Sequence, residues 1–243
     1  MDFLGYVENK KRIVIKDKNI SVNTEFGKIE REVLINSKHG DVVETSKGKK
    51  VTLLEPNFFD KYQSMKRGAQ SIKLKDCATI LSETLVGKNS ICLDCGAGMG
   101  GLSCFLARYV KKVYSVDYVK KHLENSEKNA KMLGLKNIKF IEADIYEKIP
   151  VKTKLDLITL DIINPEKIVV EAKKKLKKGG SIVAYCPQAT QMQVFVQALT
   201  ENEFQFIKSF EIIKRSWKVE GKILRPEHIG LMHTGFLVFG RRI

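Results

Sequence analysis

Long hydrophobic runs are absent from this sequence of 243 residues. The longest apolar stretches, such as residues 182–185 and 236–239, fall far short of the roughly 20 residues that a membrane-spanning helix needs. The N-terminus carries Asp2 and Glu8 where a secretory signal would begin with basic residues, and no apolar segment follows it. We therefore expect no membrane partner and a cytoplasmic location.

Paired cysteines are also lacking, because the five cysteines cannot all pair in disulfides. Cys92 and Cys95 form the one C-x-x-C spacing, but a zinc site would need a second pair of ligands, and Cys92 lies within an apolar run. Free cysteine is among the residue types most often buried. The sequence thus predicts core thiols and no metal site.

Acidic residues are too few to balance the basic ones, since 28 Asp and Glu face 43 Lys and Arg and the net charge is +15. Residues 65–200 hold most of the excess, with 23 basic and 13 acidic residues. Such a charge attracts polyanions, of which nucleic acid is the commonest. A lysine-rich chain can also simply have a solvated surface, so charge alone leaves both interpretations open. The hydrophobic fraction of 43% is close to the globular norm and predicts a folded core.

The first part of the chain has no helical periodicity. Alternating apolar residues predict short strands at 12–15 and 32–35, and a hairpin over residues 41–55. The sequence therefore predicts a small β-rich domain over residues 1–62, followed by a larger domain over residues 63–243.

From residue 73 onward, short apolar runs alternate with amphipathic segments, which is the pattern of a parallel α/β sheet. The expected strands cover residues 91–94, 113–117, 138–143, 155–161 and 181–185. The expected helices cover residues 101–109, 118–133, 165–176 and 188–199. Two further strands, at 204–213 and 233–239, suit an antiparallel hairpin at one edge of the sheet.

A glycine-rich loop follows the first strand of this series. Gly96, Gly98 and Gly101 satisfy G-x-G-x-x-G, in which glycine lets backbone N–H groups approach a ligand closely. Asp117 ends the next strand, where an acid accepts hydrogen bonds from ribose hydroxyls. NAD and S-adenosylmethionine (SAM) both contain such a ribose, so these residues leave two cofactors open.

Two further acids favour SAM. Asp94 precedes the loop, where a carboxylate can orient the ammonium end of a methionine and would repel a pyrophosphate. Asp144 follows the third strand and is placed to accept from the amine of an adenine. The whole pattern resembles the class I SAM-dependent methyltransferases. This resemblance implies a Rossmann-like α/β fold with a seven-stranded, mostly parallel sheet and an antiparallel C-terminal strand.

A narrower resemblance lies in the second half of the chain. The fourth strand ends at residues 161–165 (DIINP), and the segments 215–217 (RSW), 225–226 (RP) and 233–237 (HTGFL) follow in that order. From about residue 54 to its end, the chain resembles the tRNA (adenine-58 N1) methyltransferases, which act in the T loop. Bacterial and archaeal members of that family are homotetramers with a small β-rich N-terminal domain, so we expect tRNA and further copies of this chain as partners.

The resemblance implies roles for individual residues. Asp161 is the implied catalytic acid and also lies beside the sulfonium, and Tyr185 lines the acceptor pocket. With Asp94 and the loop glycines included, the expected cofactor contacts are Gln70, Asp94, Gly96, Gly98, Met99, Gly100, Gly101, Leu102, Asp117, His122, Asp144, Ile145 and Asp161. Two positions depart from the family pattern, because Lys73-Leu74 replaces Tyr-Pro and Glu166 replaces an aromatic residue.

Chemistry supports the choice of Asp161 independently of the family. Adenine N1 is already nucleophilic at pH 7, so methyl transfer needs alignment more than deprotonation. A carboxylate that accepts from the adenine N6 amine would orient the ring and stabilise the positive charge that develops. The base must leave its stack to reach the site, and Tyr185 and Trp217 are candidates to stack on it, although both also suit a core. His39, His228 and His233 are expected to be structural.

The leading expectation is an enzyme that methylates N1 of adenine 58 in tRNA, with the neighbouring position 57 left open. An acceptor such as a corrin precursor, another small molecule or a protein side chain is the alternative within the same fold. A tRNA-binding subunit without catalysis would have lost the glycine loop or Asp161, and both are intact.

Overall fold

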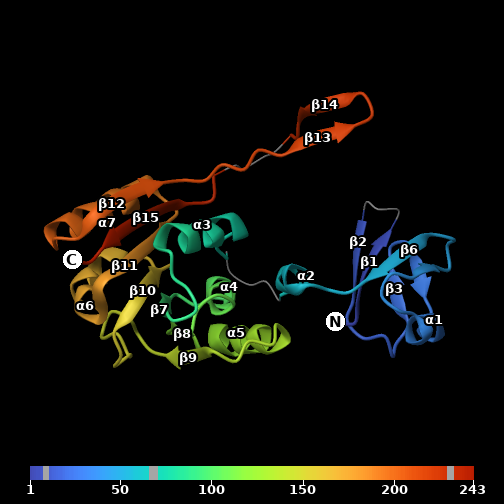
Figure 1. Ribbon diagram of the computed structural model, residues 1–243, viewed down its shortest axis with the longest axis horizontal. Coiled ribbons are helices and arrows are strands. Elements are labelled where there is room, and N and C mark those ends of the chain that lie inside the picture. The colour runs from blue at the N-terminus through green and yellow to red at the C-terminus, as the bar shows by residue number, and fades with distance from the viewer. Residues whose placement is uncertain (8–10, 66–70, 229–232) are drawn as a thin grey trace. The chain divides into compact units, whose positions relative to one another are not determined.

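The computed structural model describes residues 1–7, 11–65, 71–228 and 233–243, and the chain divides into two compact units, Met1–Met65 and Lys66–Ile243 (Figure 1). No helix in the described ranges is long and apolar enough to cross a membrane.

The N-terminal unit is built on a four-stranded antiparallel sheet in the order β2-β1-β6-β5. Its strands are β1 (Phe3–Val7), β2 (Lys11–Ile15), β5 (Val42–Glu44) and β6 (Lys50–Leu54). A short ribbon and two helices complete it: β3 (Val22–Thr24), β4 (Gly27–Ile29), α1 (Arg31–Asn36) and α2 (Phe58–Gln63). Apolar side chains from several of these elements, among them Ile15, Ile29, Leu34 and Leu53, are fully buried in one cluster. The predicted strand at 12–15 and the predicted hairpin over 41–55 are confirmed.

The predicted strand at 32–35 is wrong, because these residues form helix α1. The run is short and apolar, and periodicity alone does not separate a strand from one helical turn at that length. Only Leu34 is buried on this helix, while Val33 is 39% exposed. Neighbouring apolar residues therefore face different surroundings, as the alternation suggested, but on a helix.

The C-terminal unit contains a seven-stranded sheet in the order β12-β15-β11-β10-β7-β8-β9. Its strands are β7 (Ile91–Cys95), β8 (Lys112–Asp117), β9 (Ile138–Glu142), β10 (Leu155–Leu160), β11 (Leu176–Cys186), β12 (Gln205–Phe210) and β15 (Phe236–Arg241). All neighbouring pairs from β9 through β11 are parallel, whereas β15 pairs antiparallel with both β11 and β12. The predicted fold class, a mostly parallel sheet with an antiparallel C-terminal strand, is confirmed.

Helices connect these strands and cover the sheet. They are α3 (Leu74–Thr84), α4 (Gly101–Ala107), α5 (Lys120–Met132), the 3₁₀ turn η1 (Pro165–Ile168), α6 (Val169–Lys175) and α7 (Ala189–Glu201). Figure 1 shows α4 and α5 beside β7, β8 and β9, and α6 and α7 beside β11 and β12. The chain runs outward from β7 to β9 and then returns to β10 and β11 on the other side of β7. This reversal creates a switch point between the carboxyl ends of β7 and β10, where open α/β sheets bind ligands.

In the C-terminal unit, one helix and one hairpin go beyond the predicted set. Helix α3 precedes the first parallel strand, and a two-stranded hairpin, β13 (Trp217–Glu220) and β14 (Ile223–Pro226), occupies the segment between the last two sheet strands. No strand was predicted for that segment. The central strands of the sheet, such as β10, were easier to predict because most of their residues are apolar and buried. In β10, five of six residues are buried.

Candidate active site

The glycine loop turns sharply between β7 and α4. Gly96 has φ +86°, and its N–H and that of Ala97 both donate to the carbonyl of Val116 at the end of β8, at 2.9 and 3.0 Å. A Cβ placed on Gly96 would lie only 2.2 Å from the carbonyl oxygen of Asp161. The loop therefore lies directly against the end of β10, which no residue with a side chain would allow.

Gly98 faces open space. It has φ +51°, and a Cβ there would meet only the Gly96 carbonyl oxygen, at 4.0 Å. Gly98 lines a pocket at the carboxyl ends of β7 and β10, so a ligand can approach the backbone of the loop at this point. The residues that line this cofactor pocket are Ser71, Ile72, Asp94, Gly96, Ala97, Gly98, Met99, Gly101, Leu102 and Asp161.

Asp94 lies beneath the loop and is almost fully buried, with 2% of its surface exposed. Both of its carboxylate oxygens accept hydrogen bonds, one from the Ser103 hydroxyl and the other from Thr159 Oγ1 at 2.8 Å. Burial raises the pKa of Asp94 to about 6, and the two hydroxyl donors act in the opposite direction by stabilising the charged form. Asp94 thus holds β7, α4 and β10 together at the floor of the pocket.

Asp161 lies at the carboxyl end of β10, where its N–H donates to the Cys95 carbonyl at 2.9 Å. Burial and, to a smaller extent, the neighbouring charge of Asp94 raise the pKa of Asp161 to about 7. The raised pKa favours the neutral form of the acid. A cationic ligand beside Asp161 would lower this pKa and favour the ionised form.

The ends of β8 and β9 border the loop. Asp117 accepts from the Gly98 N–H at 2.9 Å, from the Val119 N–H at 2.9 Å and shares a 3.1 Å contact with His122 Nδ1. The Ala143 N–H donates to the Asp117 carbonyl at 3.1 Å, which aligns the ends of the two strands.

Asp144 and Ile145 follow β9 and differ in exposure. Asp144 is exposed and its Oδ1 accepts from the Tyr146 N–H at 2.8 Å, whereas Ile145 is buried in the main core. Neither lines the cofactor pocket, but both stand next to the Asp117 strand end.

Helix α5 braces the glycine loop with a row of polar side chains. Ser126 Oγ donates to the Gly98 carbonyl at 2.9 Å, and Asn129 Nδ2 donates to the Met99 carbonyl at 3.0 Å. With His122, these residues are spaced four and three apart, so they lie on one helix face. This polar row was not predicted, although its spacing is visible in the sequence.

A second pocket also includes Asp161 and lies between the end of β10 and the start of α7. Gln191 Nε2 donates to the carbonyl of Ile162 at 3.0 Å and to that of Ile163, and so fixes the loop that follows Asp161. The lining residues of this acceptor-side pocket are Asp161, Ile162, Ile163, Asn164, Glu166, Pro187, Gln188, Thr190, Gln191 and Val194. Asp161 is common to both pockets.

The two predicted stacking residues lie in different surroundings. Tyr185 ends β11, is 8% exposed, and donates from its hydroxyl to the Thr234 carbonyl. Burial raises the pKa of Tyr185 to about 12, so its phenol stays protonated. Trp217 lies on the hairpin and is 54% exposed, with the Arg215 guanidinium 5.8 Å from its ring centroid. The expectation that Trp217 could be core is therefore wrong.

The structure thus brings seven of the predicted cofactor contacts into one pocket: Asp94, Gly96, Gly98, Met99, Gly101, Leu102 and Asp161. Gly100 is the N-cap of α4, while Asp117, His122, Asp144 and Ile145 adjoin the pocket without lining it. Gln70 lies outside the described residues.

The structure bears on the cysteines and on metal binding. All five cysteines are buried, as expected of core thiols. Among the residues that the structure describes, no cluster of three His, Cys, Asp or Glu could hold a metal ion.

Comparison with known proteins decides the family. The model of the family described as "tRNA methyltransferase complex GCD14 subunit" matches residues 62–234. The chain belongs to this family. The resemblance stated from the motifs is confirmed, and the family match spans the glycine loop, Asp161 and most of the C-terminal segments.

Individual relatives agree with this assignment. The chain is 29% identical over 220 residues to the tRNA (adenine(58)-N(1))-methyltransferase TrmI of Thermus thermophilus, covering 89% of this chain and 86% of the relative. It is 28% identical over 264 residues to the tRNA (adenine(57)-N(1)/adenine(58)-N(1))-methyltransferase TrmI of Methanocaldococcus jannaschii, covering 96% and 92%. Among solved structures, a SAM-dependent O-methyltransferase from Thermotoga maritima is similar with a TM-score of 0.92 and 27% identity, covering 100% of this chain and 93% of that one.

The backbone contact at Gly96 predicts a stability difference between two glycine variants. Gly96→Ala should lower the free energy of unfolding by about 3 kcal/mol or more, because left-handed strain is joined by a clash with backbone. Gly134→Ala is the matched control, since Gly134 has φ +72° but a Cβ there would meet nothing within 4 Å, and it should lose only about 1–2 kcal/mol. Urea unfolding followed by circular dichroism measures both. Equal losses would show that the contact with Asp161 does not constrain the loop.

Proposed function

We propose that this protein transfers a methyl group from SAM to N1 of adenine 58 in the T loop of tRNA. The observation that carries the proposal is that Asp161 lines both the cofactor pocket and the acceptor-side pocket, in a chain that belongs to this methyltransferase family. One carboxyl group can then contact the cofactor and the accepting base together. Position 57, which is named for the relative from M. jannaschii, is a possible second target for the same geometry.

The residues of the cofactor pocket fit SAM. The open space above Gly98 admits a ligand against the loop backbone, and Asp161 and Asp94 supply negative charge opposite a sulfonium and an ammonium group. Gly96 to Leu102 would hold the methionine part, Asp117 with His122 the ribose, and Asp144 with Ile145 the adenine. When bound, SAM supplies the methyl group on a positively charged sulfur.

Asp94 lies beneath the pocket, and its two carboxylate oxygens already accept hydrogen bonds from Ser103 and Thr159. These hydroxyls leave lone pairs on each oxygen, so the carboxylate can still accept from an ammonium group. Its proposed contribution is negative potential at the floor of the pocket, with Asp161 as the group in direct contact.

The chain needs to align the base more than to activate it. The lone pair of adenine N1 forms the new N–C bond while the S–C bond breaks and its electron pair stays on sulfur, so the positive charge moves to the base. In its ionised form, Asp161 would accept from the adenine N6 amine, hold the ring in line and stabilise this charge. Alignment of this kind can contribute about 7–11 kcal/mol to a barrier reduction. No residue has to remove a proton from N1.

The acceptor-side pocket offers surroundings suited to an extruded base. Its lining is mixed, with amide and hydroxyl groups from Asn164, Gln188 and Thr190 beside apolar Ile162 and Val194. Unstacking a base costs a few kcal/mol, which contacts of this kind must offset. Glu166 lies in this lining, so the pocket presents an acid at the position where the resemblance led us to expect an aromatic residue.

The distribution of charge supports a polyanionic acceptor. The 23 basic and 13 acidic residues of the segment 65–200 belong to the same unit as the two pockets. A small-molecule acceptor such as a corrin precursor would not require this excess, and a protein side chain would not be favoured by it. An intact glycine loop and Asp161 argue against a non-catalytic subunit. The homotetrameric assembly stays a prediction that follows from the resemblance to the family, and the cytoplasmic location stays a prediction from the sequence.

The proposed reaction is tested by incubating the protein with labelled SAM and an unmodified tRNA transcript, followed by nucleoside analysis. N1-methyladenosine is the expected product, and it should disappear when the transcript carries no adenine at positions 57 and 58. A methylated ribose or another methylated base in its place would refute the assignment of the acceptor atom.

The raised pKa of Asp161 predicts a pH dependence of cofactor affinity. Below about pH 7 the carboxyl group is neutral and above it is charged, so binding of a cationic sulfonium releases a proton and affinity should rise by up to about tenfold from pH 6 to 8. Calorimetric titration with SAM measures this rise. Asp161→Asn is the control, because it keeps the shape and retains the ligand's own titration, and its profile should be flatter by that factor. Identical profiles for the two proteins would remove Asp161 from the cofactor site.

Salt separates the two ligands. Affinity for tRNA should fall by more than about tenfold between about 50 and 200 mM salt, the loss expected for two or more phosphate contacts. SAM affinity should change by less than about twofold, because its contacts are short-range and partly buried. A tRNA affinity that does not respond to salt would contradict the role given to the basic surface and favour the small-molecule alternative.

A further inference from the structure

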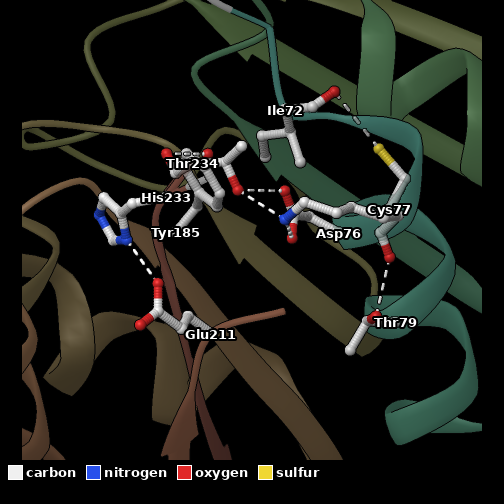
Figure 2. Close-up of polar contacts among 9 residues, drawn as sticks. Ile72, Asp76, Cys77, Thr79, Tyr185, Glu211, His233 and Thr234 are labelled. Carbon is white, nitrogen blue, oxygen red and sulfur yellow. Dashed lines mark hydrogen bonds and ion pairs between the residues drawn. The ribbon is translucent and has the colours of Figure 1, made fainter. Parts of the chain in front are cut away.

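Tyr185 is held from two directions at the end of β11. The Tyr185 hydroxyl donates to the carbonyl of Thr234. Gly235, which follows Thr234 in the chain, lies against the Tyr185 ring. A Cβ on Gly235 would stand 2.5 Å from the Cζ atom of Tyr185 and 2.8 Å from its Cε2 atom. The backbone of residues 234–235 therefore fixes both the tip and the face of this ring. Figure 2 shows Tyr185 beside Thr234.

The Thr234 side chain is in turn anchored to helix α3. Its hydroxyl donates to Asp76 Oδ2 at 2.9 Å and accepts from Lys75 Nζ at 2.6 Å, while Lys75 Nζ also donates to Asp76 Oδ1 at 2.7 Å. Asp76 is fully buried and the Lys75 side chain is 17% exposed. Three groups thus form a closed triangle that joins the segment before β15 to a helix more than 150 positions earlier in the chain.

His233 anchors the same segment on its other side. Its Nδ1 lies 2.6 Å from Glu211 Oε2 and its Nε2 lies 3.3 Å from the Pro187 carbonyl, as Figure 2 shows for the Glu211 contact. Both partners only accept, so these two contacts suit the charged imidazolium, which can donate from both ring nitrogens. The hydrogen bond with Glu211 raises the pKa of His233 accordingly.

The ion pair between Lys75 and the buried Asp76 is weak evidence for stability, since well-packed apolar residues in place of such a pair often stabilise a protein equally well. What the triangle does supply is a fixed direction for the Thr234 carbonyl. The hydroxyl of Tyr185 is consumed by that carbonyl and its phenol stays protonated, so neither donation to a substrate nor proton transfer is left to it. The ring itself is the part that can act.

We propose that Asp76 and Thr234 are positioning residues that set the plane of the Tyr185 ring against the base to be methylated. This inference rests on the proposed function. Leu160 and Ala184 are in register, so the residues that follow them, Asp161 and Tyr185, lie side by side at the carboxyl ends of β10 and β11. Tyr185 does not line the acceptor-side pocket itself, and the inference makes it a preformed wall beside Asp161. A ring fixed before the base arrives spares the ordering of that side chain during binding, and misplacement by about 1 Å can reduce a rate about a hundredfold.

The test is a double-mutant cycle on Thr234→Val and Tyr185→Phe, with the single-turnover rate of methylation at saturating SAM and tRNA as readout. Each single variant removes one link of the same chain of contacts, so each should lower the rate by about tenfold to a hundredfold. The double variant should be no slower than the slower single variant, because residues acting through one contact are not additive. The dissociation constant of SAM should stay within about twofold of the wild-type value in all three.

Conservative and control variants complete the design. Thr234→Ser keeps the hydroxyl and should restore the rate to within a few fold of wild type, while Asp76→Asn keeps an acceptor oxygen for Thr234 and should fall between the two. Thr84→Val is the matched control, since Thr84 Oγ1 donates only to the Ile80 carbonyl at the other end of α3, and its rate should be unchanged. If Thr234→Val does not fold, as judged by circular dichroism, the Thr234→Ser and Asp76→Asn rates decide the question.

The outcomes separate this inference from the proposed function. A wild-type protein that makes no N1-methyladenosine refutes the function. A wild-type protein that is active, with additive losses in the cycle or with Thr234→Val at the wild-type rate, refutes the positioning role alone. Loss of SAM affinity in Thr234→Val would also overturn it, because the defect would then belong to the cofactor site.

Discussion

The contact between the Gly96 backbone and the carbonyl of Asp161 is the constraint on which the site depends. A Cβ on Gly96 would stand 2.2 Å from that oxygen, so the glycine loop and the end of β10 can meet only because no side chain lies between them. The Asp161 N–H reaches the Cys95 carbonyl from the same side at 2.9 Å. The glycine loop and the carboxyl group that we propose to face the acceptor are consequently parts of one rigid junction. The strand order of the sheet places that junction at the switch point between β7 and β10.

Electrostatics work at two scales around this junction. Close to it, burial raises the pKa of Asp94 and of Asp161 to about 6 and about 7, so a cationic ligand gains most by drawing Asp161 into its charged form. Further out, the chain carries a net charge of +15, which favours capture of a polyanion. The local field is negative and the overall field is positive. A cationic cofactor and an anionic RNA can therefore be attracted to the same molecule without competing for the same groups.

Much of the fold and of the candidate site could be predicted from the sequence. The parts that could not are a short helix and contacts between residues far apart in the chain. The sheet strands and the glycine loop were predictable because burial and backbone geometry restrict which residues can occupy them, as at β10 and Gly98. Helix α1 stands where residues 32–35 predicted a strand, because four residues are too few to show the helical period of the apolar side chains. The bonds from Thr234 to Asp76 join residues far apart in the chain, and no local pattern encodes such a contact. The row formed by His122, Ser126 and Asn129 was visible as spacing, but only the fold shows that it faces the glycine loop.

A crystal structure with S-adenosylhomocysteine bound would test the central claim most directly, namely that the cofactor and the acceptor meet at Asp161. The account predicts the methionine part against Gly96 to Leu102, the ribose hydroxyls at Asp117, and the sulfur within contact distance of the Asp161 carboxylate, with the acceptor-side pocket still open on the other side of that residue. A ligand bound away from the glycine loop, or one whose sulfur is turned away from Asp161, would contradict the account.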